Sequence, residues 1–276
     1  MNSIKFGTDG WRAIIASDYT VENVRRVAEA TAIWLKNTGG KQVVIGYDCR
    51  FGGVLFANTT ASVLGAYGIK VLMSPDFSST PMVSLGVAKT NSQLGVVITA
   101  SHNPPDYNGY KLKSHFGGPL SPAQVSEVEA LVPEKCSLSV FPSIESLKEA
   151  GLFEYLDLEQ MYLDHVEKSF DLEGIKMAKV GVAYDAMYGA GQRAMPRILP
   201  DAHCLHCDFN PSFRGQAPEP IHKNLQELSA LIANNPDIQL GIATDGDADR
   251  IGLYDAFLIK ENHIAAAGSI KAAVST

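Results

Sequence analysis

Three carboxylates alternate in the last part of the sequence, at Asp245, Asp247 and Asp249, directly after an apolar segment that ends at Thr244. In an extended segment, alternate residues point to the same side, so these side chains are expected to lie together. Like charges this close repel one another unless a cation lies among them. Carboxylate oxygens suit Mg²⁺ or Ca²⁺, and the adjacent Arg250 could bind a phosphate on the same metal. The loop predicts a divalent-cation site, with a solvated acidic turn as the alternative.

A second polar loop, Thr99 to Pro104, also follows an apolar segment and contains Ser101 and His102. The glycines of a hydrolase nucleophile elbow are missing around this serine. The Asn108-Gly109 pair predicts a turn, after which a short strand would bring Lys111 back toward the serine. Serine, histidine and lysine beside a metal site would suit group transfer through the hydroxyl. Taken alone, however, the loop is more typical of an ordinary polar turn.

A third candidate is the glycine-rich N-terminal segment from Phe6 to Arg12, with the sequence FGTDGWR. Glycines allow a ligand to approach the backbone closely, and a guanidinium such as that of Arg12 can bind phosphate. An ordinary turn before the first helix explains the segment equally well.

Three other patterns in the sequence indicate a site only weakly. Residues 189–194 match the G-x-G-x-x-A outline of a dinucleotide-binding turn, with Asp208 about 20 residues on, but four residues separate its first glycine from the preceding strand. Residues 203–207 contain two histidines and two cysteines, yet no second cysteine pair completes a zinc site. An EF-hand is excluded because its required glycine and glutamate positions hold Arg250 and Ala256.

The elements that must position these loops alternate between helices and apolar strands, which favours an α/β fold with mostly parallel sheets. Helices are expected to begin near Thr20, Thr80 and Ser121. We expect further helices at 191–199 and 225–234, and strands at 42–48, 69–74, 94–99, 180–184, 202–208 and 240–244. In each half the third strand ends in a polar loop, so the Ser101 loop and the acidic loop could face each other across a cleft.

Composition limits the function classes. The chain has 276 residues and a net charge of −7 at pH 7, which favours two domains and argues against nucleic acid or an anionic membrane as a partner. No apolar run is long enough to span a membrane, and no signal pattern opens the chain. Four cysteines suit a reducing compartment. We therefore expect a cytoplasmic protein, whose oligomeric state the sequence leaves open.

Taken together, the three motifs resemble those of the alpha-D-phosphohexomutase family, which contains phosphoglucomutases and phosphomannomutases. The resemblance rests on Phe6–Arg12, on Thr99–Lys111 and on Asp245–Arg250, in that order. The loop at 185–191 and the Pro-Glu-Pro segment at 218–220 also look like family features. The likeness extends from residue 4 to about residue 254.

The resemblance implies a role for each site residue. Ser101 would be the phosphoserine that donates and accepts the phosphoryl group, and His102 and Lys111 would assist proton transfer at the sugar hydroxyl. Arg12 and Arg250 would steady the phosphoryl group. The metal, Mg²⁺, would be held by Asp245, Asp247, Asp249 and phosphorylated Ser101. The substrate would be a phosphosugar, interconverted between hexose 1-phosphate and hexose 6-phosphate through a hexose 1,6-bisphosphate.

The expected fold class is α/β, with two similar three-layer α/β/α domains and mixed, mostly parallel sheets. We place the Ser101 domain at residues 1–145, the metal-binding domain at 146–256, and an atypical tail at 257–276 as the possible start of a truncated third domain. The family's third and fourth domains, which recognise the sugar and its other phosphate, are not found in the sequence. The chain alone is thus expected to be inactive as a mutase. A non-catalytic binding remnant and a dinucleotide-binding domain stay as alternatives.

Overall fold

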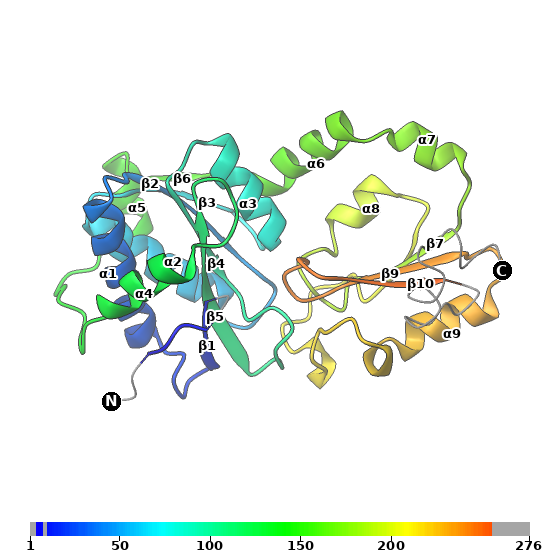
Figure 1. The fold of residues 1–276 in the computed structure, drawn as a ribbon, viewed down its shortest axis with the longest axis horizontal. Coiled ribbons are helices and arrows are strands. Elements are labelled where there is room, and N and C mark those ends of the chain that lie inside the picture. The colour runs from blue at the N-terminus through cyan, green and yellow to red at the C-terminus, as the bar shows by residue number, and fades with distance from the viewer. Residues whose placement is uncertain (1–3, 8–9, 256–276) are drawn as a thin grey trace.

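The computed structural model describes residues 4–7 and 10–255, which form two β-sheets arranged along the long axis of the molecule (Figure 1). The predicted tail at 257–276 lies outside these residues. In spatial order, the first sheet contains β1 (Trp11–Ile14), β5 (Tyr107–Ser114), β4 (Leu94–Ile98), β2 (Gln42–Tyr47), β3 (Lys70–Met73) and β6 (Phe153–Tyr155). The second contains β10 (Ile251–Asp255), β9 (Leu240–Thr244), β7 (Val182–Asp185) and β8 (His203–Leu205).

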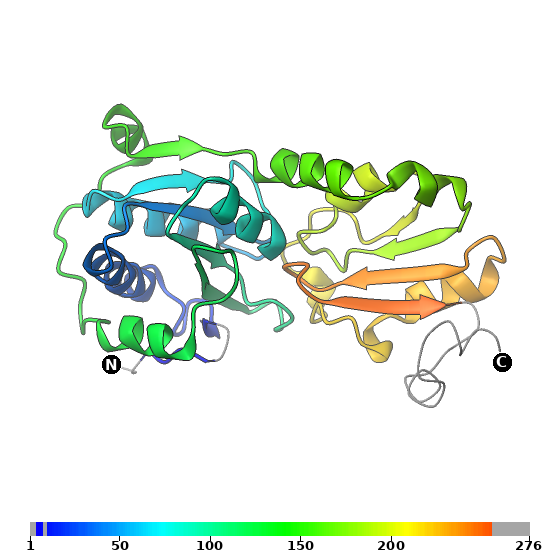
Figure 2. The same ribbon diagram turned by 45° about the horizontal axis from the view of Figure 1, so that its top comes forward.

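The first sheet is covered by helices on both faces (Figure 2). In β2, Val43 and Ile45 pack toward one face and Val44 toward the other, which is the alternation expected of a strand buried on both sides. One face carries α1 (Val21–Asn37), α2 (Gly53–Ala66), α4 (Pro122–Ala130) and α5 (Ile144–Glu149), and the other carries α3 (Thr80–Lys89) and α6 (Leu158–Ser169).

The predicted helix starts are confirmed by side-chain caps. The Thr20 hydroxyl accepts a hydrogen bond from the backbone N–H of Asn23 at the start of α1. Ser121 and Gln124 form a reciprocal capping box at the start of α4, with proline at its first position. Helix α3 begins at Thr80, as expected, and its cap is Ser79.

The second sheet repeats the arrangement on a smaller scale. Helix α9 (Gln226–Asn234) packs against β7 and β9, and α8 (Ala194–Ile198) lies on the opposite face in Figure 1. The core between α9 and the sheet contains Ala183, Leu228, Ile232 and Ala243. Helix α7 (Leu172–Met177) and two short 3-10 turns, Phe213–Gly215 and His222–Asn224, complete the described elements.

The two sheets share one topology. The order β5-β4-β2-β3 in the first corresponds to β10-β9-β7-β8 in the second, with the same parallel and antiparallel pairings. Even the strand ends correspond, because Asp48 and Asp185 each accept a hydrogen bond from the backbone N–H two residues further on. The α/β fold class with mixed, mostly parallel sheets is therefore confirmed. Strands β4 and β9 occupy equivalent places, and each ends in one of the two polar loops.

Two local predictions were wrong. Asn108 and Gly109 do not form a turn but lie inside β5, paired with β1, because the chain has already reversed at residues 101–106. Strand β8 ends at Leu205 and not at residue 208. The domain division at residue 145 stays a prediction; residue 145 lies in α5, and β6 beyond it pairs with β3 of the first sheet. Across the described residues, no helix is long and apolar enough to cross a membrane.

Candidate active site at the contact between two loops

The Ser101 loop and the acidic loop meet where the two sheets face each other. The Ser101 hydroxyl donates a hydrogen bond to Asp245 Oδ2 at 2.7 Å, joining residues 144 positions apart in sequence. Both side chains are fully buried. Gly246 lies against the same loop, since a Cβ on it would come within 2.5 Å of the Ser101 carbonyl oxygen. The predicted meeting of the two loops is thus present as direct contact.

The backbone of Ser101 is in the left-handed region, with a φ of 54°. This conformation is uncommon outside glycine and is found where the surroundings enforce it. Here the enforcing contact is a hydrogen bond of 2.8 Å from the Ser101 backbone N–H to the Thr99 hydroxyl, which itself donates to Asp48 at 2.6 Å. Asp48, directly after β2, therefore fixes the backbone of Ser101 through the Thr99 hydroxyl.

Arg50 holds the other side of the loop, and sequence reasoning did not single it out. Its buried guanidinium pairs with Asp48 at 3.2 Å and donates to four backbone carbonyls of the loop. These carbonyls belong to Ser101, Asn103, Pro104 and Tyr107. Burial raises the pKa of Asp48 to about 6, although the Arg50 cation opposes the shift. The only signal in the sequence was a charged pair directly after a strand.

The three carboxylates lie together as predicted, although the path of the chain differs from the prediction. Asp245, Asp247 and Asp249 sit in the tight connection between antiparallel β9 and β10, with Ala248 in the left-handed region, and not in an extended segment. One carboxylate oxygen from each lies within 4.8 Å of the others. Asp245 Oδ1 also accepts from the backbone N–H groups of Asp249 and Arg250, both at 3.1 Å.

Elements of the first half reach across to the acidic loop. Lys111 in β5 is buried, and its Nζ lies 2.8 Å from Asp247 and 3.0 Å from Asp249. At the start of α3, the Thr80 hydroxyl donates to Asp247 Oδ2 at 2.6 Å, and the Thr80 N–H donates to the Asp247 carbonyl. Burial opposes ionisation of Asp247, but Lys111 and Thr80 outweigh it and lower its pKa.

The donor set fits a divalent cation. The Lys111 ammonium balances one of the three charges. Burial and the neighbouring Asp247 charge raise the pKa of Asp245. The positive groups of the protein therefore do not fully neutralise the negative charge of Asp245 and Asp247. Asp247 Oδ1 is buried and has no hydrogen-bond partner. A buried carboxylate oxygen without a hydrogen-bond partner destabilises the folded state, and hard cations such as Mg²⁺ prefer carboxylate oxygens as ligands.

The remaining predicted residues border the same contact. His102 Nδ1 lies 3.5 Å from the Ser101 Oγ, and burial together with the cations Arg250 and Arg12 lowers the pKa of His102. Arg12 in β1 donates to the Asn103 side chain at 2.9 Å. Arg250 is exposed directly before β10. Gly10 and Gly7 of the N-terminal motif form a short bridge, whereas Thr8 and Asp9 are outside the described residues.

Two of the disfavoured segments, 189–194 and 203–207, have other roles. Gly189 packs on the acidic loop, because a Cβ there would come within 2.6 Å of the Asp245 carbonyl, and the Ala190 N–H donates to Gly246. This glycine turn therefore supports the acidic loop. In residues 4–7 and 10–255, the only metal-type cluster is the Asp245 group. His206 instead bridges Asp185 at 2.9 Å and Glu227 at 3.2 Å.

The His206 bridge predicts a pH-dependent contribution to stability. The Asp185 hydrogen bond, against the cost of burial, raises the pKa of His206 above its ordinary 6.5. Charged His206 then stabilises the folded state fully below that ordinary value, and this is lost as pH rises through the raised pKa. We expect the melting temperature of His206→Gln to lie furthest below wild type under about pH 6 and to approach it above about pH 8. The facing groups are Asp185, Glu227 and Tyr188.

Exposed His115 supplies the control for this measurement. His115→Gln should leave the melting temperature close to wild type at every pH. A constant difference between His206→Gln and wild type across the pH range would contradict the assigned role of the Asp185 pair.

Comparison with known proteins gives concordant matches. Residues 3–137 match the family model "Phosphoglucomutase/phosphomannomutase, alpha/beta/alpha domain I", and residues 160–256 match that of domain II. A protein of Methanobrevibacter smithii named as a probable phosphoglucosamine mutase is 35% identical, over 91% of this chain and 54% of its own length. A phosphoglucomutase/phosphomannomutase of Thermococcus kodakarensis is 32% identical, with 91% and 55% covered.

A solved structure of a phosphomannomutase-type protein from Thermus thermophilus superposes with a TM-score of 0.83 at 33% identity, covering 92% of this chain and 57% of that one. The chain thus spans about half the length of the relatives it matches. Residues 241–276 also match the model of the quinolinate phosphoribosyl transferase C-terminal domain, which overlaps the domain II match at 241–256.

Proposed function

The chain belongs to the alpha-D-phosphohexomutase family, and from this premise we propose that it passes a phosphoryl group through Ser101 during interconversion of hexose 1-phosphate and hexose 6-phosphate. The observation that carries the proposal is the 2.7 Å hydrogen bond from Ser101 to Asp245. It holds the hydroxyl at the one cluster of carboxylates in the described part of the chain that could bind a metal.

In the proposed reaction, a hexose 1,6-bisphosphate gives up one phosphoryl group to Ser101 Oγ, and in the reverse direction the phosphoserine returns a phosphoryl group to the other hydroxyl of the hexose monophosphate. The bond between phosphorus and the sugar oxygen breaks, a bond to Oγ forms, and the serine proton passes to the sugar oxygen. The lowered pKa of His102 favours a neutral imidazole, which can accept and return this proton. Lys111, in direct contact with Asp247 and Asp249, would assist at the sugar hydroxyl, and Arg12 and Arg250 would bind the phosphoryl oxygens.

Asp245, Asp247 and Asp249 would hold Mg²⁺ together with an oxygen of phosphorylated Ser101. Asp247 Oδ1 is buried without a hydrogen-bond partner, so coordination to the ion would stabilise this atom in particular. When bound, the ion would neutralise charge on the phosphoryl oxygens. Thr80 and Lys111 keep the Asp247 carboxylate in place through hydrogen bonds to its Oδ2.

We further propose that each loop belongs to its own domain, the serine loop to the first sheet and its helices and the acidic loop to the second. The two equivalent sheets support this division, and the pairing of β6 with β3 favours a boundary after residue 155.

Hexose 1,6-bisphosphate would be the phosphoryl donor to the chain.

Serine phosphorylation tests the proposal directly. Incubation with glucose 1,6-bisphosphate and Mg²⁺ should increase the intact mass by one phosphoryl group, located at Ser101 by peptide mapping. Ser101→Ala should abolish the increase, and Asp247→Asn or removal of the metal with a chelator should reduce its rate at least about 100-fold, as expected for loss of electrostatic stabilisation.

Ser126→Ala, at an exposed serine on α4, is the matched control and should be phosphorylated at Ser101 like wild type. An unmodified Ser101 in a folded, Mg²⁺-saturated protein would contradict the proposal and favour a non-catalytic binding protein.

A further inference from the structure

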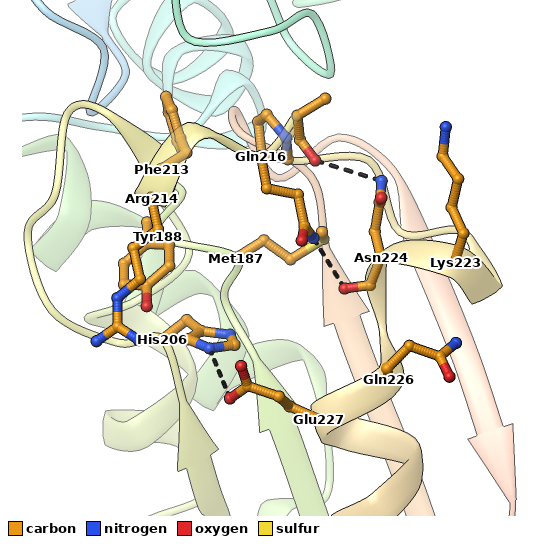
Figure 3. A pocket seen from close by; sticks show the side chains of 12 residues that line it. Met187, Tyr188, His206, Phe213, Arg214, Gln216, Lys223, Asn224, Gln226 and Glu227 are labelled. Carbon is orange, nitrogen blue, oxygen red and sulfur yellow. Dashed lines mark hydrogen bonds and ion pairs between the residues drawn. The ribbon is translucent and has the colours of Figure 1, made fainter.

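A pocket of about 320 Å³ opens in the second half of the chain, between the ends of β7 and β8, the 213–218 loop and the start of α9 (Figure 3). Its lining does not include Ser101, Arg12 or the three aspartates. It touches the site described above through Pro218, whose Cγ would lie 3.1 Å from a Cβ on Gly246. Its size is at the lower end of the range for small-molecule sites.

Backbone strain is concentrated around this pocket. Ten non-glycine residues in the described chain have a positive φ, and five of them line the pocket. The five are Met187, Tyr188, His206, Phe213 and Arg214. A left-handed conformation is unfavourable for a non-glycine residue, so such a group persists only where the surroundings enforce it, as happens at functional sites.

A buried polar atom in the wall of the pocket has no hydrogen-bond partner. Tyr188 is only 4% exposed, and its hydroxyl makes no hydrogen bond. Figure 3 shows this side chain at one end of the pocket with Arg214 and His206 beside it. The Tyr188 ring centre lies 4.7 Å from that of His206 and 5.4 Å from the Arg214 guanidinium carbon. A buried hydroxyl without a hydrogen-bond partner, next to an imidazole and a guanidinium, indicates a site for a ligand that accepts or donates hydrogen bonds.

The charges of the pocket indicate that this ligand is an anion. Within the described residues, neither Arg214 nor Lys223 forms an ion pair, whereas the acidic groups Asp185 and Glu227 are both engaged by His206. Helix α9 also begins here, with no side chain capping its first N–H groups and with Glu227, the acidic residue of its first turn, turned to His206. A helix start of this kind favours negative charge.

We propose that this pocket binds a small phosphorylated sugar, with the phosphate at Arg214 and Tyr188 and the sugar hydroxyls toward Glu227 and the side-chain amides. The lining is mixed, because Met187, Ala217 and Pro218 contribute apolar surface beside the polar groups. Such a mixture suits a sugar ring, which has apolar faces and polar edges. The inference goes beyond the proposed function, since the residues that would carry out the phosphoryl transfer are elsewhere.

Met187 gives a local readout of binding. In protein labelled with ¹³C at the methionine methyl groups, titration with glucose 6-phosphate should shift the Met187 signal saturably, the signal being assigned from Met187→Leu. Inorganic phosphate should compete, and uncharged glucose should leave the signal unmoved. Arg214→Met should weaken binding at least about tenfold, the usual effect of losing a charge-assisted contact to phosphate.

Arg25→Met is the matched control, because Arg25 likewise lies over an aromatic ring, that of Phe141. It should bind glucose 6-phosphate like wild type. Tyr188→Phe removes only the orphaned hydroxyl and should weaken binding without lowering the melting temperature. The shift should persist in Asp247→Asn, which separates this proposal from the function proposed for Ser101. A Met187 signal that never moves, or that moves equally in Arg214→Met, would overturn it.

Discussion

Replacing Arg50 with methionine should lower the free energy of unfolding by about 3–5 kcal/mol, the usual effect of removing one partner from a buried ion pair. The Arg50 and Asp48 side chains are fully buried. Without the guanidinium, Asp48 loses its counter-charge, and the loop carbonyls of Ser101 and Asn103 lose the donors that the structure shows for them. Urea-induced unfolding would measure the loss.

Arg26→Met is the matched control for Arg50. Arg26 is also buried, but it bonds to the Pro133 carbonyl and the Asn23 side chain instead of a carboxylate, so its loss should be the smaller. Arg50→Lys should recover little of the wild-type stability, since one ammonium cannot reproduce the planar fork of donors. Asp48→Asn combined with Arg50→Met should be less damaging than the sum of the single changes. Equal losses for Arg26→Met and Arg50→Met would contradict the account.

Gly246→Ala should reduce the rate of Ser101 phosphorylation by about 100-fold, because a displacement near 1 Å at a reacting group has effects of this size. The new Cβ would come within 2.5 Å of the Ser101 carbonyl oxygen. That carbonyl is held by Arg50 and cannot give way, so the acidic loop must move away from the serine. Phosphate incorporation from glucose 1,6-bisphosphate, followed by intact mass over time, measures the effect.

The control for Gly246 is Gly174→Ala in the exposed helix α7. A Cβ there meets only the side chain of Asp171, which can move. This variant should be phosphorylated at the wild-type rate. A wild-type rate in Gly246→Ala would show that the close contact of the two loops is unnecessary for the chemistry.

Sequence patterns predicted the parts of the site that local rules control. An apolar strand followed by Asp245, Asp247 and Asp249 was enough to place three carboxylates together, and the equivalence of β4 and β9 was enough to bring Ser101 toward them. Lys111 was expected near the serine, and the structure places it on Asp247 and Asp249. Its position comes from strand β5, although the turn expected at Asn108-Gly109 does not exist.

The supporting groups could not be predicted in the same way. Arg50 acts on carbonyls more than 50 residues away, and Thr80 acts on Asp247 from the other half of the chain. Neither partnership leaves a local pattern, since each depends on how distant segments pack. Asn108-Gly109 shows the converse, because a strong turn signal is overridden when Gly109 is needed for close strand packing. A Cβ on Gly109 would lie 2.3 Å from the Thr99 carbonyl.

The long separation between Ser101 and Asp245 has a consequence for the order of assembly. Contacts within each sheet join nearer segments and are expected to form first, whereas a contact across 144 residues forms late. During synthesis, the serine loop would emerge and be fixed by Asp48 and Arg50 before the acidic loop exists. Newly made chains would therefore pass through a stage with an ordered serine and no carboxylate partner, and the ability to become phosphorylated would mark the last step of folding.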